Sequence, residues 1–407
     1  METQLVQLSE VEGSITSAKG FHAGGLHCGI KYKRDDLGWL YSEVPATTAA
    51  VFTTNVFQAA PLQVTKESIA TEQKIQGLLV NSGVANACTG DEGLQNAYDM
   101  RHLLADKLAV ADHLVAVNST GVIGDQLPME KLKAGVNAID FEKSVSADFS
   151  KAILTTDTFT KHACVQLELD SQLITIGGTA KGSGMINPNM ATMLSFITTD
   201  AAIEPVALDS ALRTAVNQTF NCITIDGDTS TNDTVMVMAN GLAANETITL
   251  GDQEPFTLFT EALTFVCQSL AKQIARDGEG ATKLIEVQVT GAASTQDARK
   301  VGKAIVGSSL VKTAVFGADA NWGRIICAMG YSDAAFDPGK LSISLGQTMI
   351  IDQGLPIAFD ESKVHDYLQQ HETITILANL NSGSQEAMAW GCDLSYDYVK
   401  INASYRT

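Results

Sequence analysis

Short runs of apolar residues recur along the whole chain, at lengths typical of buried strands. Gly, Asn, Asp, Ser or Pro, the residues that favour turns, stand near most of these runs. The runs that predict strands lie at residues 49–53, 77–81, 114–118, 165–169, 173–176, 193–197, 234–238, 284–289, 341–345, 349–352, 373–378 and 386–390.

Longer segments between these runs carry apolar residues at helical spacing. Residues 94–108 place Leu and Ala on one face, and residues 205–220 open with Pro205, which is favoured in the first turn of a helix. Residues 256–274 and 294–305 predict two further helices. Because strands and helices alternate throughout, the pattern predicts an α/β protein with helices layered against sheet. No repeat or linker marks a domain boundary.

Composition narrows the class of protein. A chain of 407 residues with 45% hydrophobic residues can bury a large core. The net charge of −19 argues against a nucleic-acid partner, since phosphate binding needs clustered Lys and Arg. The apolar runs are far shorter than the roughly 18 residues of a membrane span. The first residues show no basic segment followed by an apolar one. We therefore expect a soluble, cytoplasmic protein without a membrane partner.

The cysteines and histidines predict no disulfide and no metal site. The seven cysteines are odd in number and none has CxxC spacing. We expect reduced, mostly buried thiols, as in the apolar surroundings of Cys327. The histidines show no HExxH motif. The segment 226–233 alternates oxygen-bearing residues like a calcium loop, but Thr231 and Val237 replace the required Gly and Glu. A hydrogen-bonded turn is the better interpretation.

The motifs of common cofactor and hydrolase sites are missing from the sequence. Lys181 precedes its glycines, so the order of a phosphate-binding loop is not present, and no GxGxxG motif follows a strand. No GxSxG motif occurs. We expect no cofactor.

Three polar blocks are ambiguous when each is taken alone. NSTGVIG at 118–124 follows a predicted strand and would ordinarily be a turn, although such a turn can also direct donors at an oxyanion. For TTDT at 155–158 and DGEGAT at 277–282, caps and turns are the better interpretation of each block in isolation.

The segment KGSGMINPNMATML at 181–194 contains the most informative hydroxyl, that of Thr192. A threonine becomes a nucleophile when its own α-amino group acts as the base, which requires a cut immediately before it. An α-amino pKa of about 8 leaves a fraction of the amine as free base at neutral pH. The glycines, Pro188 and the small Ala191 would suit a strained, cleavable peptide. From the spacing alone, a core or capping role for Thr192 is still the better interpretation.

Taken together, these blocks resemble the glutamate N-acetyltransferase family, also called ornithine acetyltransferase, of arginine biosynthesis. DGDTSTNDT at 226–234 and GADANWGRI at 317–325 are also similar to family blocks, and the similarity runs essentially end to end. The resemblance implies a layered helix/sheet sandwich with a smaller C-terminal α/β part. It also implies self-cleavage between Ala191 and Thr192, into an α chain of residues 1–191 and a β chain of residues 192–407, which assemble as a heterotetramer of two of each.

The resemblance further implies roles for individual residues. Thr192 would be the nucleophile, and Thr120 and Gly121 would form the oxyanion hole. The substrate would contact Thr155, or the adjacent Thr156, together with Lys181, Thr192, Glu279, Asn402 and Thr407. No metal or cofactor is implied.

The implied reaction moves an acetyl group from N2-acetyl-L-ornithine to L-glutamate through an acetyl-threonine intermediate. Some family members also use acetyl-CoA, which would be a second activity. Two alternatives stay open at this point. A self-cleaving aminopeptidase or amidase would hydrolyse its acyl intermediate, and a non-catalytic α/β binding protein would stay a single chain.

Overall fold

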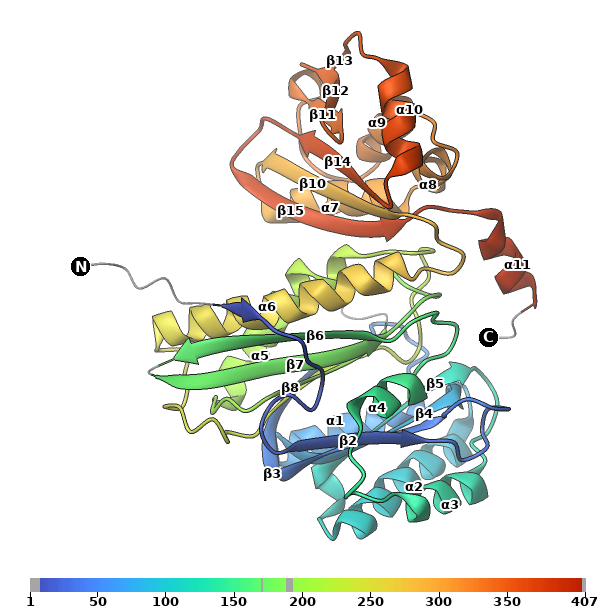
Figure 1. The fold of residues 1–407 in the computed structure, drawn as a ribbon, viewed down its shortest axis with the longest axis vertical. Helices are drawn as coiled ribbons and strands as arrows, with labels where there is room; N and C mark the ends of the chain where they lie inside the picture. Colours follow the sequence, from blue (N-terminus) through green and yellow to red (C-terminus); the bar gives the residue numbers. More distant parts are fainter. Residues whose placement is uncertain (1–7, 170, 188–192, 405–407) are drawn as a thin grey trace.

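The computed structural model describes residues 8–169, 171–187 and 193–404, and contains two sheets (Figure 1). The larger sheet has nine strands in the order β1-β6-β7-β8-β9-β3-β4-β5, with β2 paired to β3. Its strands are β1 (Ser9–Glu10), β2 (Phe21–Leu26), β3 (Leu37–Phe52), β4 (Lys74–Val84), β5 (Val115–Val122), β6 (Lys161–Leu169), β7 (Gln172–Lys181), β8 (Leu194–Thr199) and β9 (Thr234–Ala239).

The long strand β3 divides this sheet into two layers. Its first half pairs with β2 and β4, and its second half pairs with β9, with a register shift between Tyr41 and Ala46. Side chains from β8 and β9 therefore share one core cluster with side chains from β2, β4 and β5. Phe149 of α4 (Ser146–Ala152) lies in this cluster against Phe196, with 5.9 Å between ring centroids.

Helices cover the outer faces of both layers. α5 (Pro205–Gln218) and α6 (Gln253–Arg276) pack on β6 to β9 through a large apolar cluster. A second group packs on β3 to β5, namely α1 (Ala60–Glu72), α2 (Gly90–Leu108) and α3 (Met129–Ala138). Figure 1 shows this succession of helix, sheet, sheet and helix. The predicted α/β layered sandwich is confirmed.

The smaller C-terminal part has its own six-stranded sheet and its own core. The sheet order is β13-β12-β11-β14-β10-β15, from β10 (Leu284–Ala292), β11 (Ser342–Leu345), β12 (Thr348–Asp352), β13 (Leu355–Pro356), β14 (Thr373–Asn379) and β15 (Gln385–Cys392). Its helices are α7 (Thr295–Gly307), α8 (Ser309–Phe316), α9 (Trp322–Gly330) and α10 (Glu361–Gln370). A last helix, α11 (Tyr396–Ser404), leaves this part and lies at the side of the molecule (Figure 1).

Every segment predicted as a strand or helix is present, but two predictions were wrong. The block at 118–122 is not a turn, since it continues the strand β5. Cys327 is exposed, because α9 directs Ile325, Ala328 and Met329 to the core instead. Four of the other six cysteines are buried, as predicted. Within the described ranges, no helix has both the length and the apolar character that crossing a membrane demands.

Candidate active site

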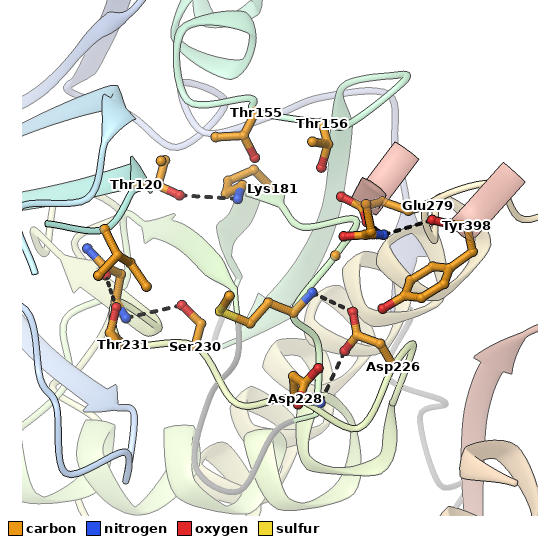
Figure 2. Close-up of a pocket in the computed structure, with 16 residues that line it drawn as sticks. Thr120, Thr155, Thr156, Lys181, Asp226, Asp228, Ser230, Thr231, Glu279 and Tyr398 are labelled. Carbon is orange, nitrogen blue, oxygen red and sulfur yellow. Dashed lines mark hydrogen bonds between the residues drawn. The ribbon is translucent and has the colours of Figure 1, made fainter. Parts of the chain in front are cut away.

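An open pocket of about 200 Å³ lies where the ends of β5 and β7 approach α11. Figure 2 shows its lining side chains converging from elements that are far apart in the sequence. The lining residues are Thr120, Gly121, Ile123, Thr155, Thr156, Lys181, Gly184, Met185, Asp226, Asp228, Ser230, Thr231, Asn232, Glu279, Tyr398 and Asn402. Six of these are predicted site residues, and they are all those that the structure describes: Thr120, Gly121, Thr155, Lys181, Glu279 and Asn402. Their roles in catalysis and binding stay predictions.

The end of β5 supplies Thr120 and Gly121. Gly121 has a φ of 136°, and a Cβ added to it would lie 2.2 Å from the carbonyl carbon of Gly83 on β4. Only glycine fits this position, because β4 and β5 approach so closely there. The Thr120 side chain is buried and its Oγ1 accepts a hydrogen bond of 3.2 Å from Lys181 Nζ.

Lys181 is a buried cation at the end of β7. Its residue is 8% exposed, and it pairs with Leu194 at the start of β8. Burial lowers the pKa of the Lys181 ammonium, and this shift is opposed by the carboxylates of Asp157 and Asp233. No carboxylate of the described residues forms an ion pair with Lys181 within 4.0 Å. A buried ammonium without such a partner is suited to bind a carboxylate of a substrate.

The loop after α4 brings Thr155 and Thr156 to the pocket. The backbone N–H of Thr155 donates to Asp157 Oδ2 at 3.0 Å. Burial would raise the pKa of Asp157, but the ammonium groups of Lys161 and Lys181 hold it well below its usual range. Asp157 is therefore a fixed negative charge beneath this loop. Both threonines line the pocket, so the choice between them stays open.

Glu279 lies on the wall of the pocket beneath α11. Asn402 Nδ2 on that helix donates to Glu279 Oε2 at 2.7 Å. The glycine at 184 makes room for this carboxylate, because an added Cβ would lie 2.5 Å from its carboxyl carbon. Glu279 is nearly buried, so its carboxylate is suited to pair with a cationic group of a substrate.

Asp226 holds the backbone at Met185 and Ile186, in the segment before the predicted cut, by hydrogen bonds. Its carboxylate accepts from the backbone N–H groups of Met185 at 2.6 Å and Ile186 at 2.9 Å. Burial raises the pKa of Asp226, against the effect of these donors. Thr229 Oγ1 also donates to the carbonyl of Asn187 at 3.0 Å. The predicted turn at 226–233 is thus also the anchor of this segment.

Ala191, Thr192 and Thr407 lie outside the described residues. Their neighbours on either side of the predicted cut are nevertheless described. Met185 lines the pocket, and the carbonyl of Met193 accepts from the N–H of Thr234 at 2.8 Å, where β8 begins beside β9.

Several lining residues were not singled out from the sequence as site residues. The polar residues of 226–232 belong to a block that resembled the family, yet the pattern favoured a turn. No sequence motif marked Tyr398 as a site residue. Burial, together with the nearby Asp226 and Glu279, raises the pKa of Tyr398 to about 12, so it stays a neutral phenol. In the part of the chain that the structure describes, no group of His, Cys, Asp and Glu is arranged to hold a metal ion.

Comparisons with known proteins identify the family of the chain. The ArgJ family model matches residues 22–407. The chain is 55% identical to the arginine biosynthesis bifunctional protein ArgJ of Halalkalibacterium halodurans, over 97% of this chain and 96% of the relative. It is 54% identical to that of Geobacillus kaustophilus, over 99% of both chains. A crystal structure of ArgJ from Bacillus halodurans, 55% identical, has a TM-score of 0.50 and covers 52% of this chain and 98% of its own. The predicted family is therefore confirmed, and the chain belongs to the ArgJ family.

Proposed function

We propose that this protein transfers the acetyl group of N2-acetyl-L-ornithine to L-glutamate, giving L-ornithine and N-acetyl-L-glutamate in cyclic arginine biosynthesis. The names of the relatives place them in arginine biosynthesis. One observation in the structure carries the proposal. A buried cation, Lys181, and a nearly buried carboxylate, Glu279, line the same pocket as the strand end at Thr120 and Gly121.

We infer that the chain first cleaves itself between Ala191 and Thr192. The anchoring of Met185 and Ile186 by Asp226 supports this, because a cleavable peptide must be held in a defined geometry. The crystallised chain of the Bacillus halodurans relative is also only about half as long as this one, as a fragment would be. The products would be residues 1–191 and residues 192–407.

In the proposed reaction, Thr192 is both nucleophile and base. Its α-amino group takes the proton of the hydroxyl while Oγ attacks the acetyl carbonyl of N2-acetyl-L-ornithine. The Thr120 hydroxyl and the Gly121 N–H are the proposed donors to the resulting oxyanion. The tetrahedral intermediate expels the ornithine amine, which takes up the proton, and an acetyl ester remains on Thr192. The free amine of glutamate then attacks this ester. N-acetyl-L-glutamate leaves, and the proton lost by the amine returns to the Thr192 hydroxyl.

The charges of the pocket fit a substrate that carries both signs. Lys181 would bind a carboxylate, and Thr155 and Asn402 would add neutral hydrogen bonds. Glu279 would pair with the side-chain ammonium of ornithine. Figure 2 shows Lys181 and Glu279 on different sides of the pocket. Thr407 would complete the substrate contacts, as the family resemblance implies.

Further properties follow from the family. The relatives are named bifunctional, which supports acetyl-CoA as a second acetyl donor for glutamate. We propose a heterotetramer of two α and two β chains, acting in the cytoplasm without a metal or cofactor.

Three measurements test the proposal. Denaturing mass spectrometry of the purified protein should give the two fragments. Thr192→Ala should abolish both cleavage and transfer, while Thr192→Ser, which keeps a hydroxyl beside the amine, should retain both in part. Incubation of N2-acetyl-L-ornithine with and without glutamate separates transfer from hydrolysis. Ornithine released equally fast without glutamate would favour the aminopeptidase or amidase alternative, and an intact, inactive chain would favour a binding protein.

A further inference from the structure

A buried cluster of three charged side chains lies beside the pocket, outside the residues that line it. Lys161 Nζ is 2.7 Å from Asp157 Oδ1 and 2.5 Å from Asp277 Oδ2. The side chains of Lys161 and Asp157 are fully buried, and that of Asp277 is 2% exposed. Replacing a buried ion cluster with well-packed apolar side chains often costs a protein no folding stability. The charges of this cluster therefore point to a role other than stabilising the fold.

On one side the cluster holds the backbone that carries two proposed substrate contacts. Asp157 accepts from the N–H of Gly182 at 2.7 Å and from the N–H of Thr155 at 3.0 Å. Gly182 directly follows Lys181. Asp157 therefore fixes the Thr155 loop and the end of β7 relative to each other.

On the other side the cluster holds the backbone that carries Glu279. Asp277 accepts from the N–H and the hydroxyl of Thr158. The Asp277 carbonyl accepts from Ser183 Oγ at 2.7 Å, and the Ser183 carbonyl accepts from the Glu279 N–H at 3.0 Å. These bonds run without interruption from the cluster to Glu279.

We infer that Asp157, Lys161 and Asp277 are positioning residues that set the separation of Lys181 and Thr155 from Glu279. The inference rests on the proposed function, in which one substrate is held at both ends. After the proposed cleavage, Asp157 and Lys161 belong to one fragment and Asp277 to the other. The Lys161–Asp277 ion pair then joins the two fragments next to the pocket.

The test is Asp277→Asn in the full-length, cleaved protein. The amide is nearly the same size as the carboxylate but removes the charge that Lys161 and Thr158 bind. We expect the KM for N2-acetyl-L-ornithine, which is held at both ends, to rise about 10-fold or more and that for glutamate to rise less, with a much smaller change in kcat. A positioning defect weakens binding of the ground state and the transition state alike, so it appears in KM. A purely structural defect instead removes active molecules and lowers kcat at unchanged KM.

The matched control is Asp209→Asn on α5. It breaks an exposed ion pair in which Arg213 Nε lies 2.7 Å from Asp209 Oδ2. It should leave both KM values unchanged. Should Asp277→Asn fail to fold, Thr158→Val at this exposed residue removes only the hydroxyl that donates to Asp277, and it should still raise KM several-fold. Unchanged KM values in the folded variant overturn the inference. The comparison requires a wild-type protein that transfers acetyl groups. A wild type without acetyl transfer contradicts the proposed function and not this inference.

Discussion

Gly121→Ala should disable acetyl transfer by moving the proposed oxyanion donors. The added Cβ would lie 2.2 Å from the Gly83 carbonyl carbon and 2.6 Å from the backbone nitrogen of Val84. An ordinary contact begins at 3.4 Å, so β4 and β5 must separate by roughly 1 Å near the pocket. Donors act on an oxyanion only within about 2.7–3.1 Å. A shift of this size therefore removes the Gly121 N–H from range, which typically costs about 100- to 1,000-fold in rate.

Gly124→Ala is the matched control for this substitution. Gly124 also has a positive φ, 88°, so alanine strains the backbone at either position by about 1–3 kcal/mol. An added Cβ at Gly124 meets nothing within 4 Å, however, so the strands need not move. We expect a larger loss of stability in Gly121→Ala, which also forces the strands apart, and an unchanged transfer rate in Gly124→Ala.

The assay follows ornithine release in the presence of glutamate, per molecule of cleaved protein. Denaturing mass spectrometry gives the cleaved fraction, because Gly121→Ala can also slow the self-cleavage. Thermal unfolding compares the stabilities of the two variants. A Gly121→Ala protein that is cleaved and transfers acetyl groups at the wild-type rate would refute Gly121 as an oxyanion donor.

Three further predictions concern charged groups at the pocket. Glu279→Gln should raise the KM for N2-acetyl-L-ornithine about 10-fold and that for glutamate less, because only ornithine presents a side-chain ammonium; equal KM changes would contradict this pairing. Asp226→Asn should slow cleavage, since it weakens two charge-assisted bonds to the segment before the cut, and a time course by mass spectrometry that matches the wild type would count against it. Burial lowers the pKa of Lys181, so kcat/KM should fall as alkaline pH removes its proton. In Asp157→Asn the fall should begin at lower pH, because the Asp157 charge raises that pKa while Lys161 lowers it; an unshifted pH profile would exclude Lys181 as the titrating group.

The apolar periodicity was sufficient to predict most of the sheet strands and four of the helices, α2, α5, α6 and α7. α5 begins at Pro205, as its sequence indicates, because proline suits the first turn of a helix. The pattern failed where tertiary contacts override local preference. Asn118, Ser119 and Thr120 have the composition of a turn, yet they continue β5 because β4 pairs with them. α11 was not predicted, since it has no buried residue that could impose a periodic pattern.

For the site, the sequence alone determined which residue types are present and, through ordered motif blocks, the family to which the chain belongs. It could not determine which of those residues meet. Lys181 reaches Thr120 across 61 positions of sequence, and Lys161 reaches Asp277 across 116, because β5, β6 and β7 and the end of α6 converge at one end of the sandwich. Hydrogen bonds and ion pairs act over about 3 Å, so only the folded chain decides them. The tertiary structure thus decided that Asp226 anchors the segment before the proposed cut, and that Lys161 and Asp277 form a buried ion pair beside the pocket.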